Sequence, residues 1–103
     1  MIEVVSGTSG ANAALVATLT GVTDWRHKIY SVVWSYSADP TGGSLTSTGL
    51  RGTGELFYNI TVGGPGAVPM PPVYADLGSD VTFTLAAAGG AIVGTLSIFF
   101  ESE

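Results

Sequence analysis

Several short segments of the chain alternate apolar with polar residues, and this period of two residues predicts β-strands. Residues 55–62 show the alternation most clearly, because every second residue is apolar: Leu56, Tyr58, Ile60 and Val62. Eight extended segments can be recognised in this way, at residues 2–5, 12–19, 27–37, 44–48, 55–62, 68–74, 79–86 and 91–100. Residues 12–19 also contain helix-favouring alanine and leucine, but their alternation and their strand-like neighbours favour a strand.

Glycine and proline mark the connections between these segments. Fifteen glycines and five prolines fall largely in the predicted turns, at residues 39–43, 49–54, 63–66 and 87–90. The segment 68–74 contains three prolines, so it fits an edge strand or an extended crossing and not a central strand. The pattern therefore predicts an all-β fold: a single-domain antiparallel β-sandwich, jelly-roll-like, with about eight short strands.

The length of 103 residues allows one domain. The glycine- and serine-rich run at residues 6–12 reads as a flexible joint. We expect residues 1–10 to be a flexible N-terminal arm and residues 11–103 to be the β-sandwich domain.

The composition changes this picture in one respect. Apolar residues make up 46% of the chain and charged residues only 11%, whereas a soluble monomer usually keeps about a quarter of its surface charged. We therefore expect apolar surface to be covered by another chain, as in a homo-oligomer or a larger assembly. The net charge of −5 argues against nucleic acid as a partner.

Several classes of site and location are disfavoured by what the chain lacks. Without cysteine there is no disulfide, thiolate zinc site or cysteine nucleophile. The start of the chain has no basic segment followed by an apolar one, so we expect no signal peptide. No apolar run approaches the roughly 20 residues that span a bilayer, so we expect no membrane partner.

Residues 24–37 hold the densest chemistry, with both tryptophans, the single histidine, and Arg26 and Lys28. One interpretation is a long central strand with a polar entrance, in which the aromatic residues Tyr30, Trp34 and Tyr36 share the core face. The other is that Trp25 and the basic residues form an exposed patch that docks on an acidic or carbohydrate surface.

Catalysis finds little support in the sequence. His27 and Asp24 lie in one short segment, and no nucleophile-elbow motif accompanies them. Asp76 and Asp80 lie near predicted turns, where capping is a more ordinary role than calcium binding. We expect no enzyme activity, no catalytic residues, no metal site and no cofactor.

Three segments carry a resemblance to a known group of proteins: "SADPTGGSL" at residues 37–45, the "GGPG" and "PP" motifs within residues 63–72, and "LAAAGGAIVGTLSI" at residues 85–98. With them the chain resembles, from about Gly10 to Phe100, small tailed-phage virion proteins of the capsid decoration, or head cement, type. These are turn and strand motifs and carry over no catalytic residue.

The resemblance implies a non-enzymatic β-sandwich that binds the outside of a phage head and bridges major capsid subunits. It also implies a homo-oligomer, a trimer in particular, located on the virion surface after synthesis in the host cytoplasm. The alternative is a carbohydrate- or receptor-binding module of a head or tail fibre, with Trp25 and Tyr30 stacking on sugar.

Two sets of residues are candidates for contacts. For capsid contact we select Met1, Ile2, Glu3, Val4, Val5, Trp25, Arg26 and Lys28. For the interface between subunits we select Phe57, Phe99, Met70 and Tyr74.

Overall fold

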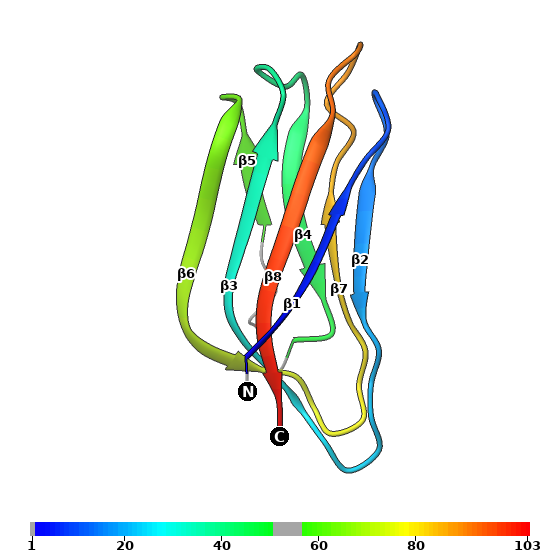
Figure 1. Ribbon diagram of the computed structural model, residues 1–103, viewed down its shortest axis with the longest axis vertical. Helices are drawn as coiled ribbons and strands as arrows, with labels where there is room; N and C mark the ends of the chain where they lie inside the picture. Colours follow the sequence, from blue (N-terminus) through cyan, green and yellow to red (C-terminus); the bar gives the residue numbers. More distant parts are fainter. Residues whose placement is uncertain (1, 51–56) are drawn as a thin grey trace.

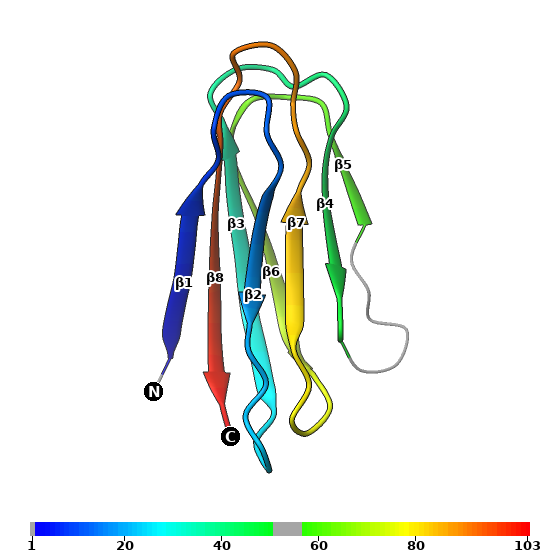
Figure 2. The same cartoon turned by 90° about the vertical axis from the view of Figure 1, so that its right-hand side faces the viewer.

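A computed structural model describes residues 2–50 and 57–103, with the backbone alone at residues 57 and 68–72. Two four-stranded sheets pack face to face as an elongated sandwich (Figures 1 and 2). The strands are β1 (Glu3–Thr8), β2 (Leu15–Leu19), β3 (His27–Tyr36), β4 (Gly43–Thr48), β5 (Phe57–Ile60), β6 (Gly64–Tyr74), β7 (Val81–Leu85) and β8 (Gly94–Ser102). The described residues contain no helix that could cross a membrane.

The strand order identifies the sandwich as a jelly roll. One sheet has the order β1-β8-β3-β6 and the other has the order β2-β7-β4-β5, with antiparallel pairing throughout. Successive strands alternate between the two sheets except for β4 and β5, which pair within one sheet, and this order is that of a jelly roll. The predicted fold class is confirmed, and residues 15–19 of the ambiguous segment 12–19 form the strand β2.

The core lies between the sheets and consists of the inward residues of the alternating strands. In β7 and β8 every second side chain is buried, and Phe83, Leu85 and Ile98 are almost completely enclosed. Burial of each such side chain contributes roughly 1.5–3 kcal/mol to stability. Gly94 lies where a Cβ would come 2.8 Å from a Leu85 methyl group, so only glycine fits this inward position without rearrangement.

A β-bulge in β3 changes which residues face the core. The register of β3 shifts between Ile29 and Ser31 against both neighbours. Against β8, where their partners Phe100 and Phe99 are consecutive, Tyr30 is the extra residue. His27 and Ile29 are buried before the bulge, and Val32 and Tyr36 are buried after it. The expectation that Tyr30 shares the core face was wrong, because an uninterrupted alternation cannot anticipate a bulge.

The N-terminal segment also differs from expectation. Residues 3–8 are not a flexible arm: they form β1 and pair along their whole length with residues 95–100 of β8. Alternation places Val5 on the inner side, where it packs against the core, so this strand is integral to the sandwich.

The proline-rich segment behaves as an edge strand, as predicted. β6 lies at the end of its sheet with β3 as its single neighbour. It is longer than expected, because it starts at Gly64 and includes Pro65 and Gly66, which were assigned to a connection. Gly66 permits this pairing: a Cβ there would lie 2.6 Å from the Trp34 indole.

Candidate functional site

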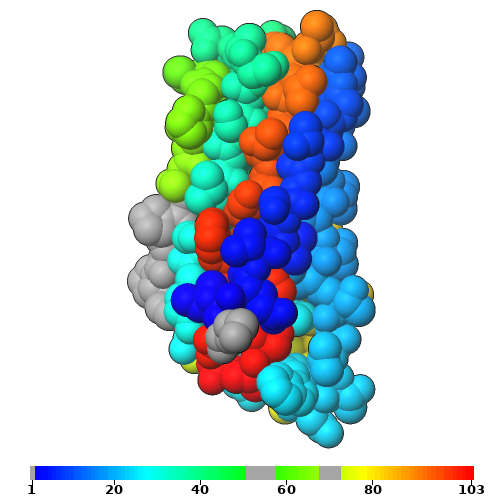
Figure 3. All heavy atoms as spheres, in the orientation of Figure 1, coloured from blue at the N-terminus to red at the C-terminus, as the bar shows by residue number. Residues whose placement is uncertain are grey.

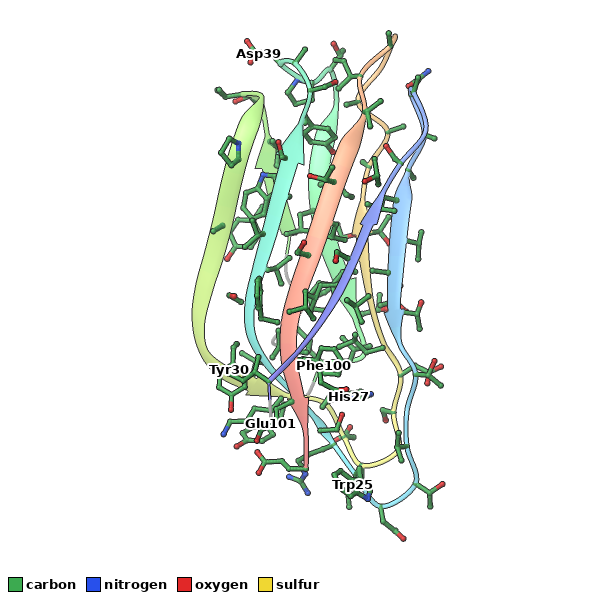
Figure 4. All side chains as sticks on the ribbon, viewed as in Figure 1. Trp25, His27, Tyr30, Asp39, Phe100 and Glu101 are labelled. Atoms are coloured by element: carbon green, nitrogen blue, oxygen red, sulfur yellow. The ribbon has the colours of Figure 1, made fainter. Side chains whose placement is uncertain are left out.

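Charged residues are concentrated at one end of the sandwich, which also holds both chain termini (Figures 1 and 4). Arg51 and Glu55 lie outside the described residues, and Asp39 lies at the opposite end (Figure 4). The remaining charged residues share this end: Glu3, Asp24, Arg26, Lys28, Asp76, Asp80, Glu101 and Glu103. We call it the charged end, and we call the opposite end, formed by residues 9–14, 37–42, 61–63 and 86–93, the neutral end.

Cations and tyrosines meet at the charged end because of the pairing between β3 and β6. Lys28 lies opposite Tyr74 in the register, and its Nζ is 5.6 Å from the centre of the Tyr74 ring and 5.4 Å from that of Tyr30. The Arg26 guanidinium lies 6.0 Å from the centre of the Tyr74 ring. These distances fit cation–π contacts, so Tyr74 links the two basic side chains into one cluster.

An acidic residue completes this cluster. Glu103 Oε1 lies 3.5 Å from Lys28 Nζ, and the backbones of Glu103 and Arg26 exchange two hydrogen bonds of 2.7 and 2.9 Å. Hydrogen bonding with Tyr74 and Tyr30 raises the pKa of the Lys28 ammonium above its ordinary value, partial burial opposes this, and the Glu103 carboxylate adds to it. Lys28 is therefore a fixed positive charge at neutral pH.

A shallow cavity of about 420 Å³ opens beside the cluster. Its lining combines an aromatic and an aliphatic side chain with both signs of charge: Asp24, Arg26, Tyr74, Leu77 and Glu103. Such a mixture can contact the apolar face of a ligand and bind its polar groups at the same time. Three of the lining residues, Asp24, Leu77 and Glu103, were not among our candidates.

The loop between β2 and β3 presents Trp25 at this end (Figure 4). Half of the Trp25 surface is exposed, although its backbone is fixed: its N–H donates to Val22 O at 3.0 Å, and its carbonyl accepts from Gly78 N–H at 2.8 Å. Asp24 adopts a positive φ of 67°, which is uncommon for a residue with a side chain. The loop thus holds a large exposed aromatic ring on an ordered backbone.

His27 has a structural position. The ring is 4% exposed, its Nε2 lies 2.8 Å from Thr20 O and its Nδ1 lies 2.9 Å from Ser102 Oγ. Because a carbonyl can only accept, Nε2 carries a proton, and in the neutral ring Nδ1 then accepts from the Ser102 hydroxyl. An edge-to-face contact with Phe100 at 5.5 Å completes its environment. His27 joins β3 to β8 and to the end of β2.

The structure brings together some of the candidate contact residues and separates others. Arg26, Lys28 and Tyr74 form one cluster, although Tyr74 was selected for a different contact. Trp25 and Tyr30, the suggested sugar-stacking pair, lie on different sides of the charged end (Figure 4). Tyr30 contacts Lys28 instead.

The remaining candidates lie mainly in the sheet that contains β1. Ile2 and Val4 are exposed, whereas Val5 packs against the core. Phe99 is partly buried and lies between Val4 and Ser31 in the register. Met1 and the side chains of Phe57 and Met70 lie outside the described residues.

The neutral end is built differently. Hydrogen bonds tie its loops to one another: Gly89 N–H donates to Asn12 Oδ1 at 3.0 Å, Thr41 N–H donates to Ala88 O at 2.8 Å, and Gly63 N–H donates to Asp39 Oδ1 at 2.7 Å. Apart from Val62, which is 69% exposed, the loops here consist mainly of small residues. This end is ordered but offers no aromatic or cationic anchor among the described residues.

The outer face of the second sheet is also without charge in the described part. Its outward positions on β2, β7 and β4 carry small hydroxyl side chains and one valine: Val16, Thr18, Thr82, Thr84, Ser44, Thr46 and Thr48. Charge therefore distinguishes the charged end from the rest of the described surface, although one further large aromatic residue, Tyr58 on β5, is also exposed, at 39%. Figure 3 shows the opposite face of the molecule, with β1 and β8 in front.

Comparison with known proteins finds similarities of structure and none of sequence family. No family model matches the chain, and no curated protein matches it. A de novo designed double-stranded β-helix is similar in structure, with 8% identity, a TM-score of 0.41, and coverage of 94% of this chain and 97% of the other.

Two viral structures are similar at the same level. One is a virus-like particle of the extra small virus of the prawn Macrobrachium rosenbergii, with 13% identity, a TM-score of 0.37, and coverage of 100% of this chain and 80% of that one. The other is the Penaeus vannamei nodavirus P-domain, with 16% identity, a TM-score of 0.34 and coverage of 93% and 94%. At these identities and TM-scores, the similarities carry no statement about what this chain does.

Proposed function

We propose that the chain is a non-enzymatic structural protein of a virion, a capsid decoration protein that binds the outside of a phage head and bridges major capsid subunits. The observation that carries the proposal is the gathering of Trp25, Arg26, Lys28 and Tyr74 at one end of an otherwise weakly charged jelly roll. Tryptophan, tyrosine and arginine are the residue types that most often dominate binding energy in protein interfaces.

The charges at this end suit a protein partner that carries both signs. Arg26 and Lys28 lie beside Glu103 and Asp24, so docking can proceed by charge pairing at the rim of the contact while Trp25 is buried at its centre. A contact that exists only on the assembled shell stabilises that shell by mass action. The resemblance noted in the sequence favours the same role.

The test is occupancy of the virion. Particles of the virus that encodes the chain are purified with wild-type protein and with Trp25→Ala, and copies per particle are counted by quantitative mass spectrometry. Loss of a central aromatic anchor weakens binding by about tenfold or more. We therefore expect fewer copies of the Trp25→Ala protein per particle than of wild type when the concentration of free protein is low. Val62→Ala is the matched control, since it truncates an exposed apolar side chain at the neutral end.

Two results would overturn the proposal. One is absence of the wild-type chain from purified particles. The other is equal occupancy by the Trp25→Ala and wild-type proteins, because the charged end would then contribute nothing to attachment.

A second candidate function is carbohydrate binding. The cavity lined by Asp24, Arg26, Tyr74 and Leu77 favours it, because carboxylates and arginine can bind sugar hydroxyls while an aromatic ring contacts the sugar face. Retention on a glycan array that is lost in Tyr74→Ala, together with absence from the head, would favour a fibre module over a decoration protein.

A further inference from the structure

The two outer edges of the β1-β8-β3-β6 sheet differ in what they offer to another strand. A free edge presents unpaired N–H and C=O groups, and proteins often block such an edge with proline. β6 forms one edge and β1 forms the other (Figure 1). What each edge offers depends on which backbone N–H and C=O groups point away from the sheet.

Hydrogen bonds at the strand ends fix this direction for β1. Ser9 N–H donates to Gly94 O at 2.8 Å, and backbone groups alternate in direction along an antiparallel strand. Glu3, Val5 and Gly7 therefore direct their groups toward β8. The backbone N–H and C=O groups of Val4, Ser6 and Thr8 therefore point away from the sheet. The hydrogen bond from Ser37 N–H to Val93 O agrees with this, because it shows that the odd-numbered residues of β8 direct their groups toward β3 and the even-numbered ones toward β1.

The same reasoning shows that β6 is partly blocked. After the bulge, the odd-numbered residues of β3 direct their backbone N–H and C=O groups toward β8. The backbone groups of Val32, Trp34 and Tyr36 therefore point toward β6. Their partners on β6 are the even-numbered residues 64, 66 and 68, so the odd-numbered positions, which include Pro65 and Pro69, face outward. Proline has no N–H, so within residues 64–69 this edge lacks two of its three outward donors and keeps only that of Ala67. β1 has no proline and no lysine, and no strand of the described residues pairs with its outer side.

Charge selects the partner and the direction. β1 and the loop that follows it carry no charge from Val4 to Gly21, so a second chain with net charge −5 meets no repulsion there. Parallel pairing of two β1 strands would bring Glu3 next to Glu3, which is unfavourable. Antiparallel pairing separates the two glutamates and places the two charged ends at opposite ends of the pair.

We propose that β1 pairs with β1 of a second copy, antiparallel and about a two-fold axis at Ser6, to form a continuous eight-stranded sheet. Val4 then lies opposite Thr8 of the other copy, Ser6 lies opposite Ser6, and the outward backbone groups of the two strands satisfy each other. This inference does not depend on the proposed function. It assigns a two-fold dimer, whereas the resemblance implied a trimer.

Cysteine cross-linking tests this arrangement directly, because the chain has no cysteine of its own. Residues opposite each other in a hydrogen-bonded pair have Cα atoms about 5.5 Å apart, within the range of a disulfide. We expect Ser6→Cys to form a disulfide dimer under mild oxidation about tenfold faster than Thr95→Cys, owing to the higher effective concentration in the pair. Thr95 is an exposed control on the neighbouring strand β8.

A second variant separates edge pairing from random collision. The Val4 N–H points away from β8, so Val4→Pro removes an outward donor and no bond to β8. In the Ser6→Cys background we expect Val4→Pro to reduce cross-linking to the rate of Thr95→Cys, with an unchanged circular dichroism spectrum. Sedimentation of the wild-type chain over a concentration series should show monomer and dimer.

The proposal is overturned if Ser6→Cys cross-links no faster than Thr95→Cys, if Val4→Pro leaves its rate unchanged, or if sedimentation shows a trimer. Loss of virion occupancy would not affect these results, so failure of this inference and failure of the proposed function can be told apart.

Discussion

The two ends of the sandwich are built from different kinds of residue. At the neutral end, loops of glycine, alanine and serine are held by hydrogen bonds between their backbones and short side chains such as Asn12 and Asp39. At the charged end, basic and acidic side chains surround Tyr74, and Trp25 is left half exposed. The comparison teaches that order alone does not mark a binding surface. Both ends are ordered, but only one combines order with aromatic and cationic anchors.

The largest effect on stability that we predict from this comparison concerns the charged end. His27→Ala leaves a cavity beside Phe100 and removes the hydrogen-bond partners of Thr20 O and Ser102 Oγ. We expect the free energy of unfolding to fall by about 2–4 kcal/mol, measured by urea denaturation. A decrease in the free energy of unfolding no larger than about 0.5 kcal/mol, as for an ordinary surface substitution, would show that His27 does not hold the strands of this end together.

A smaller effect is expected near the neutral end. The buried Tyr36 hydroxyl donates to Ala86 O at 2.7 Å, so Tyr36→Phe should cost about 1–2 kcal/mol in the free energy of unfolding at neutral pH. Equal stability of the two proteins would contradict a role for this bond in anchoring the loop after β7.

The pH dependence of this variant follows from the sign of the shift. Burial raises the pKa of Tyr36 above its ordinary value, so the folded state favours the protonated form. The stabilisation is complete below a pH of about 10 and is lost as the pH rises through the folded pKa. The stability difference between the wild-type protein and Tyr36→Phe should therefore narrow in alkaline urea titrations. Lys28 also loses its contribution at alkaline pH, but equally in both proteins.

The smallest effect belongs to the ion pair at the charged end. Glu103→Gln removes the carboxylate from Lys28, but this pair is largely accessible to water and is screened by salt. We expect a barely resolvable decrease in the thermal midpoint at low salt and none at high salt. A large decrease that persists in salt would mean that the charges of this end are essential to the fold.

Much of the fold could be predicted because the information is local. Alternation in segments such as 79–86, together with glycine and proline at the turns, is enough to place the strands. The prolines of β6 likewise predict an edge position. These features depend on residues close together in the sequence.

The site could be predicted only in part, because its geometry depends on pairing between distant strands. The sequence draws attention to Trp25, Arg26 and Lys28, but Tyr74 reaches them only through the β3–β6 register, which shifts at the bulge. Glu103 arrives through the pairing of β8 with β3. The pairing of β1 with β8 was missed for the same reason: a glycine- and serine-rich segment looks flexible until its partner strand is known.

The most direct test of the account is a cryo-electron microscopy map of the virion, at a resolution that shows strands and large side chains. The account predicts jelly-roll density at each site on the outer shell. The charged end and Trp25 of the attached copy should lie against the major capsid subunits, and the charged end of a second copy paired through β1 should point away from the shell. A map in which the neutral end contacts the shell, or in which no surface density fits the sandwich, would contradict it.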